Sequence, residues 1–258
     1  KLTYTVGQWD FNVGKDVLPI GTFEFDEYDF DSHYNFNSNL WNYLSVYQWG
    51  GSVGYTTADE ANHFTAMFSS SPFGMHPFSK EWYEECPLYG YSLGYRGEFE
   101  SFSALAAANM FEYEPGAFVY ATSVGVKVPV SDSFTFGADF MSRGYDNPTL
   151  FGQEGTALAT LTYEPSDSFS VTLKGGYEFS KDEDVFGFID DTEQFVPTSL
   201  ALLNRLQDKN FAFGGVAVHW YPMDNLRLHG VVATNNYSHS LSINVGAIYY
   251  FDLFNLFR

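Results

Sequence analysis

Residues 169–179 read FSVTLKGGYEF, and this stretch decides the fold class because its character alternates at every residue. One face would carry the apolar, aromatic and glycine residues Phe169, Val171, Leu173, Gly175, Tyr177 and Phe179. The opposite face would carry Ser170, Thr172, Lys174, Gly176 and Glu178. Successive side chains of a strand point to opposite faces, so the pattern predicts a strand with one apolar and one polar face. About eleven alternating residues exceed the roughly five or six of an average strand and match a tilted strand that crosses a membrane.

Similar alternation recurs on both sides of this segment. It predicts strands over 117–129, 133–143, 156–164, 168–179, 210–221, 225–235 and 240–251, with further strands over 2–11, 17–26, 40–50, 87–97 and 101–111. Short polar turns separate several of them, as at 164–168, whereas 143–155 and 180–209 are long, acidic and aromatic. Such asymmetry between the two ends is typical of outer-membrane barrels.

The fold expected from these features is all-β. It is a transmembrane antiparallel up-and-down β-barrel of about 12 strands, within a range of about 10–14, with short periplasmic turns and long acidic extracellular loops. An even strand number would put both termini on the periplasmic side. We expect residues 1–258 to form a single barrel domain, with 252–258 as a periplasmic tail, and we interpret the start at Lys1 as that of a mature chain.

Composition excludes several other classes of protein. The 258 residues carry a formal charge of −20, and 20% of them are aromatic. Disordered chains lack aromatic residues, and nucleic-acid binding needs a basic surface that this chain does not have. A disulfide framework is impossible with Cys86 as the single cysteine, and no apolar run approaches the roughly 18 residues of a transmembrane helix.

A soluble, secreted all-β domain with an acidic surface is the competing architecture. It would bury the same apolar face, so alternation alone does not separate the two. Strand length, turn asymmetry and the last strand favour the membrane barrel. That last strand, 241–251, reads LSINVGAIYYF, with alternating apolar residues that end in an aromatic residue.

This terminal pattern resembles the C-terminal assembly signal of bacterial outer-membrane β-barrel proteins, a broad porin-like class. The resemblance implies location in the outer membrane of a Gram-negative-type bacterium and contact with its lipid. In that class the pattern usually ends the chain, whereas here residues 252–258 follow it.

Two stretches depart from the strand pattern. Thr57-Ala58-Asp59-Glu60 fits a capping box, which predicts a short helix through Phe68. Residues 197–206 carry a second helical stripe after Pro197. We expect both helices to lie in long loops, either packed on the loops themselves or acting as a lid or docking element.

Charged and histidine side chains collect on the predicted inward face of the barrel. They are Arg96, Lys127, Asp139, Arg143, Lys174, Glu178, His219, Arg227 and His229. Such residues either form a charged constriction that selects solutes or pair with one another and fill a narrow lumen. The turn at 221–225 predicts that His219 lies opposite Arg227.

Other clusters suggest weaker hypotheses. Carboxylates at Asp182, Asp184, Asp190 and Asp191 suit a divalent cation but lack the spacing of an EF-hand loop. A second acidic run, 24–31, is expected to be a solvated loop. His239-Ser240 is the one pair that suggests a membrane-embedded lipid hydrolase, although neighbouring strand residues point in opposite directions.

We therefore expect a porin-like channel for small solutes, with cationic or neutral polar solutes preferred, and not an enzyme. A non-conducting barrel that docks other envelope proteins is the alternative, and a lipid hydrolase is the second alternative. No cofactor and no nucleic-acid partner are expected.

Overall fold

The computed structural model describes residues 1–27, 46–72, 87–145, 154–180, 210–236 and 241–250. These ranges contain one short helix, α1 (Phe23–Asp26), and thirteen strands. The strands are β1 (Leu2–Val6), β2 (Trp9–Val17), β3 (Tyr47–Thr56), β4 (Asn62–Ser70), β5 (Tyr89–Glu98), β6 (Ser103–Glu114), β7 (Ala117–Ser131), β8 (Phe134–Tyr145), β9 (Glu154–Ser166), β10 (Phe169–Ser180), β11 (Phe211–Met223), β12 (Leu226–Asn235) and β13 (Leu241–Tyr249).

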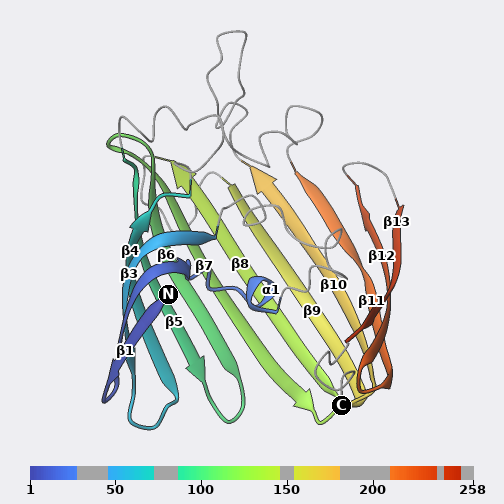
Figure 1. The fold of residues 1–258 in the computed structure, drawn as a ribbon. Coiled ribbons are helices and arrows are strands. Elements are labelled where there is room, and N and C mark those ends of the chain that lie inside the picture. Colours follow the sequence, from blue (N-terminus) through green and yellow to red (C-terminus); the bar gives the residue numbers. More distant parts are fainter. Residues whose placement is uncertain (28–45, 73–86, 146–153, 181–209, 237–240, 251–258) are drawn as a thin grey trace.

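All thirteen strands belong to one sheet, in which each strand pairs with the next along the chain from β1 to β13. Figure 1 shows this sheet curving around α1, and we call the side that holds α1 the concave face. The predicted all-β, antiparallel up-and-down architecture is confirmed. Within the described residues no pairing joins β1 to β13, and the strand number is odd rather than even.

The strand predictions from residue 87 onward are confirmed, whereas those for the first third of the chain are partly wrong. A turn at Gly7, with φ of +58°, splits the expected strand 2–11 into β1 and β2. Residues 17–26 are not a strand, because β2 ends at Val17 and α1 follows. The second predicted helix, 197–206, lies outside the described residues.

The helix predicted from Thr57 to Phe68 is also wrong. Thr57 instead closes a hairpin, since its N–H donates to the Asn62 carbonyl oxygen at 2.9 Å and Glu60 adopts a left-handed φ of 59°. The residues after this turn form β4. We had expected a strand over 40–50 that runs away from the short turns. Because β4 adds a strand before β5, β3 (47–56) instead runs toward the short turns.

The two ends of the sheet differ as predicted. Six hairpins, beginning with β1–β2 and ending with β11–β12, close through short turns at one end (Figure 1). The connections at the other end include the long ranges 18–46, 71–88 and 181–210. One connection there is short, because Pro115-Gly116 forms a tight turn in which Gly116 takes a φ of +81°.

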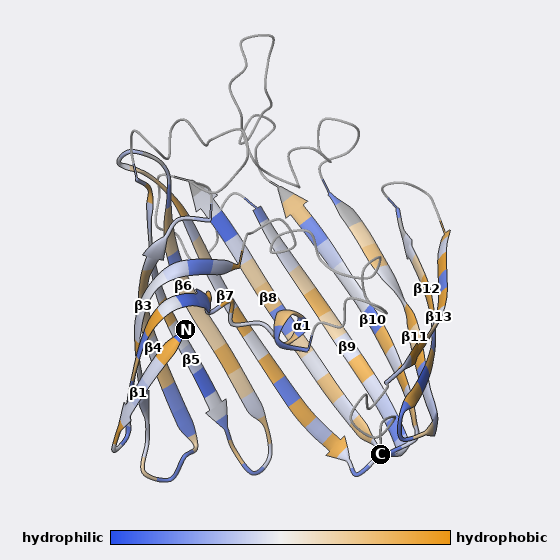
Figure 2. Ribbon diagram, in the orientation of Figure 1, coloured by the Kyte–Doolittle hydropathy of each residue, from blue (hydrophilic) through white to orange (hydrophobic). Residues whose placement is uncertain are grey.

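Large apolar side chains that are more than a third exposed lie on the convex face of every strand except β6. Leu173 is 52% exposed and Ile243 is 66% exposed, although both lie within regular strands. Figure 2 shows the alternation of hydropathy along the strands. A soluble protein rarely leaves so large an apolar face in water, so this face argues for the membrane barrel over the soluble alternative.

Exposed aromatic residues lie toward both ends of the strands. Trp9, Trp220 and Tyr249 are near the short turns, and Tyr47 and Tyr177 are near the opposite end. Aromatic girdles at the two interfaces flank the apolar band of transmembrane barrels, and this arrangement has that form. No helix in the part of the chain that the structure describes is long and apolar enough to cross a membrane.

Candidate functional site

A segment that we call the inward segment, residues 18–27, leaves β2 and runs across the concave face (Figure 1). Pro19 and Gly21 interrupt the strand pattern that β2 had established. Leu18 and Ile20 pack into a buried apolar cluster on the sheet: Leu18, Ile20, Met67, Phe111, Val119, Ala121 and Met141. The segment is therefore held against the wall by apolar contacts.

Glycines in the wall and in the segment make this close approach possible. A Cβ added at Gly21 would lie 2.5 Å from the backbone nitrogen of Ala107, and Gly21 has a φ of +74°. A Cβ at Gly94 would lie 2.6 Å from the Cβ of Pro19. Glycine alone satisfies both the left-handed backbone at position 21 and the narrow gap beneath it.

Gly21→Val should therefore release the inward segment from the wall. The β-branched side chain disfavours positive φ and collides with β6 backbone, so we expect a destabilisation of about 1–3 kcal/mol for the docked segment. Hydrogen–deuterium exchange should show faster exchange at residues 20–24 than in the wild type. Gly116→Val supplies the control, because it has a similar φ of +81° but no atom within 4 Å of the added Cβ.

Hydrogen bonds fix the backbone of the inward segment to three neighbouring strands. The Asn109 side-chain amide donates to the Pro19 carbonyl oxygen at 3.1 Å, and the Ser123 hydroxyl donates to that of Ile20. The Asp139 carboxylate accepts the Phe23 and Glu24 N–H groups, each at 2.9 Å. Asp139 thus caps the start of α1 from β8, a task that the N-cap residue Thr22 leaves undone.

Three ion pairs complete the attachment. The Lys174 ammonium lies 2.5 Å from Oε1 of Glu24, with both side chains almost fully buried. Arg96 pairs with Asp26 at 2.5 Å, and Lys127 pairs with Glu27. The acids belong to the run that we expected to be a solvated loop; that expectation is wrong for buried Glu24, whereas Asp26 and Glu27 stay exposed while they pair with bases. The basic residues of the concave face and these acids neutralise one another.

The structure places all nine predicted luminal residues on the concave face. Four of them contact the inward segment, namely Arg96, Lys127, Asp139 and Lys174. Arg143 instead pairs with Glu154, and each of these side chains is 1% exposed. Glu178 is fully buried opposite Thr156 on the same face.

The predicted pairing of His219 with Arg227 is wrong. The register shifts between Trp220 and Met223, where the strand is irregular, and this places His219 opposite His229. Their ring centroids are 6.4 Å apart. Arg227 lies opposite Ile248 instead. A symmetric turn had been assumed, and a bulge of this kind changes the register without a clear sequence signal.

Several candidates lie outside the described residues. These are the acidic positions Asp182, Asp184, Asp190 and Asp191, the pair His239-Ser240, and the tail 252–258. In the ranges that the structure does describe, no group of three or more His, Cys, Asp or Glu residues is placed to hold a metal ion.

A cavity of about 450 Å³, which we call the lumen cavity, lies between the inward segment and the concave face of β1–β6. Its wall combines hydroxyl and amide side chains with ionisable ones, including Asp10, Asp16, Asp26, His63 and Arg96. A polar space inside an apolar shell is what a small solute needs to pass through a membrane barrel. The inward segment forms one side of this space and therefore limits its width.

Sequence reasoning missed the inward segment as part of the site. The available signal was the interruption at Pro19 and Gly21, followed by an acidic run in a chain with basic residues on its inward face. The sequence shows both features. However, the ion-paired residues, such as Arg96 and Asp26, lie about 70 residues or more apart in the sequence. The pattern within one strand does not predict contacts over such a separation.

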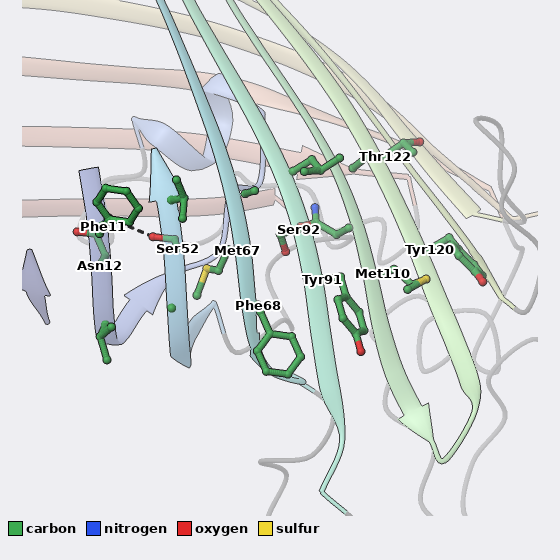
Figure 3. A pocket seen from close by; sticks show the side chains of 17 residues that line it. Phe11, Asn12, Ser52, Met67, Phe68, Tyr91, Ser92, Met110, Tyr120 and Thr122 are labelled. Atoms are coloured by element: carbon green, nitrogen blue, oxygen red, sulfur yellow. Dashed lines mark hydrogen bonds between the residues drawn. The ribbon is translucent and has the colours of Figure 1, made fainter. Parts of the chain in front are cut away.

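A second, apolar hollow of about 910 Å³ lies on the convex face across β2–β7 (Figure 3). Its lining includes Phe11, Phe68, Tyr91 and Met110 around the small residues Gly51, Ala66 and Ala108, and no charged side chain. Residues of this kind contact lipid in a membrane barrel. The large apolar side chains of this hollow face away from the polar concave site, although Asn12 and Ser52 line both spaces.

Comparison with known proteins places the fold among outer-membrane β-barrel channels. A mutant of the Rh. blastica porin superposes with a TM-score of 0.57 at 11% identity, covering 96% of this chain and 75% of that one. OmpT of Vibrio cholerae lacking loop L8 gives 0.57 at 13% identity, with coverage of 96% and 78%. The channel DcaP of Acinetobacter baumannii gives 0.54 at 12% identity, with coverage of 95% and 71%.

This chain therefore has the fold of the bacterial outer-membrane porins, as the terminal strand had suggested. No protein-family model and no curated protein sequence matches it.

Proposed function

We propose that this protein is an outer-membrane channel of a Gram-negative-type bacterium that passes small polar solutes, with cationic or neutral ones preferred. The observation that carries the proposal is the lumen cavity, a polar space bordered by the inward segment within a sheet whose convex face is apolar. Lipid would contact the convex face, and solutes would pass along the concave one.

The balance of charge supports the solute preference. Five bases of the concave face lie in ion pairs: Lys1, Arg96, Lys127, Arg143 and Lys174. Carboxylates at Asp10 and Asp139 add negative charge to the same face beyond these pairs, against one further base among the described residues, Arg227. A negatively charged passage lowers the barrier for cations and raises it for anions.

Single-channel recording from the purified protein in a planar bilayer, under a salt gradient, tests the proposal. We expect stable current steps and a reversal potential whose sign shows cation preference. Protein that is folded and inserted but silent would contradict the channel function.

Hydrogen bonds and ion pairs tie the inward segment to β5–β8 and β10, and a segment that stays in place would suit one alternative, a non-conducting barrel that docks other envelope proteins. Such a barrel would stay silent in the bilayer and would retain envelope proteins through purification. Cross-linking in intact cells, followed by purification, would identify those proteins.

Leu173→Arg tests the membrane location directly. This side chain lies midway along β10 on the convex face, so a charge there should cost about 2–4 kcal/mol of stability in lipid. The neighbouring substitution Thr172→Arg places the same charge on the concave face and should cost much less. Urea unfolding in lipid vesicles, followed by tryptophan fluorescence, measures both, and equal losses would contradict the assignment of the two faces.

A further inference from the structure

Among the described residues, the lumen cavity has one carboxylate, Asp10, that forms no ion pair with a base of the lining. Asp16 pairs with the Lys1 ammonium at 2.8 Å, and Asp26 pairs with Arg96 at 2.5 Å. Asp10 instead accepts a hydrogen bond from the Thr5 hydroxyl at 2.5 Å. The two bases of this cavity are therefore committed to the other two acids, and the charge of Asp10 remains.

Open space lies beside the Asp10 side chain. Asp10 lies opposite Gly54 in β3, and Gly54 lies opposite Thr65 in β4. A Cβ at Gly54 would lie 3.5 Å from the Cβ of Asp10 and 3.0 Å from Cε1 of His63, so the glycine leaves open space between these two side chains.

His63 contacts two threonine hydroxyls rather than Asp10. Its Nδ1 lies 2.9 Å from the Thr56 hydroxyl and its Nε2 lies 3.0 Å from the Thr65 hydroxyl.

A row of neutral polar side chains, Thr3, Asn12 and Ser52, crosses β1, β2 and β3 next to Asp10. The Thr3 hydroxyl donates to the Asn12 side-chain oxygen at 2.7 Å, and the Asn12 amide donates to the Ser52 hydroxyl at 3.1 Å. These three residues and Asp10 all line the lumen cavity. A solute there would meet one negative charge beside a row of neutral polar groups.

We propose that Asp10 and this row form a binding subsite for a small polar solute that carries an ammonium or guanidinium group. The positive group would donate to the Asp10 carboxylate, and neutral hydroxyl or amide groups of the solute would bond to Asn12 and Ser52. This inference rests on the proposed channel function and assigns its preference for cations to one residue.

Spermidine serves as the probe, because it is a small flexible cation. We expect it to reduce the single-channel current of the wild type and expect Asp10→Asn to weaken that block about tenfold or more, the equivalent of one charge-assisted hydrogen bond. The reversal potential should move toward that of a less selective channel. Asp10→Glu keeps the charge and should keep most of the block.

Asp132→Asn is the matched control, because it removes the same charge from the turn between β7 and β8, outside the lumen cavity. Equal block in wild type and Asp10→Asn, with conductance intact, would overturn the subsite while leaving the channel in place. If the wild type is silent, the channel proposal fails, and calorimetric titration of the folded protein with spermidine then decides the subsite. Binding that Asp10→Asn abolishes supports it, and absence of binding overturns it.

Discussion

Asp139→Ala combined with Lys174→Met should widen the lumen and raise the single-channel conductance several-fold. Asp139 accepts two backbone N–H groups of α1, so its loss leaves both without that acceptor, at about 1–3 kcal/mol each. Lys174→Met leaves the Glu24 carboxylate buried without its cation, which costs about 3–5 kcal/mol. The part of the segment that these contacts hold, around α1, should leave the wall, whereas Leu18 and Ile20 keep their apolar contacts.

The conductance of the double variant, recorded in a planar bilayer, measures the effect. Hydrogen–deuterium exchange at residues 18–27 shows independently whether the inward segment has left the wall. Asp132→Ala with Lys15→Met removes the same charges and side-chain types from positions that form none of the hydrogen bonds or ion pairs holding the inward segment, and it should leave the conductance unchanged. Faster exchange without a change in conductance would mean that the segment does not limit the passage.

The sequence predicts the strands after residue 87 because their alternation is long and uninterrupted. Most of these strands alternate an exposed apolar convex face with a more polar concave one, so a period of two residues extends over most of their length, although Phe111, Val119 and Ala121 face the inward segment. The polar turns between them are short and recognisable. The alternation therefore predicts the observed strand wherever the strand runs uninterrupted between a short turn at one end and a loop at the other.

The first third is harder to predict because its signals conflict. Residues 57–60 satisfy a helix capping box and also a hairpin turn, and the contacts of Thr57 with Asn62 decide for the turn. Pro19 and Gly21 end β2 early, but only the glycine gaps in β5–β7 show where the following residues can lie. Such gaps depend on strand register, which the sequence does not report.

For the candidate site too, the sequence predicts the face on which a residue lies but not the residue that it contacts. Alternation placed Lys174 and Asp139 on the inward face, which needs only the parity of each residue within its strand. It could not show that Lys174 meets Glu24, since these residues lie on elements separated by most of the chain. From the sequence, we considered two alternative roles for the inward charges: a constriction that selects solutes, or structural ion pairs. The two roles are combined at the inward segment, because the ion pairs hold this segment against the wall and the segment narrows the passage.

Arg143→Ala should destabilise the protein by about 3–5 kcal/mol, because it leaves Glu154 with a buried negative charge. The guanidinium donates to Oε2 of Glu154 through Nε at 2.9 Å and through a terminal nitrogen at 2.5 Å, and each side chain is 1% exposed. Because the charge is neutralised and shielded, ion selectivity should change little. Urea unfolding in lipid vesicles measures the loss of stability, and the reversal potential measures selectivity.

Two matched variants separate the ion pair from the loss of packing. Arg143→Met with Glu154→Leu replaces both charges by apolar side chains, and a buried pair replaced in this way is often close to neutral in stability. Lys1→Ala breaks the much more exposed pair with Asp16 and should cost less than about 1 kcal/mol. If Arg143→Ala costs no more than Lys1→Ala, the pair does not stabilise the junction of β8 and β9. A large shift in reversal potential would instead return Arg143 to the solute pathway, the role that its inward position alone had suggested.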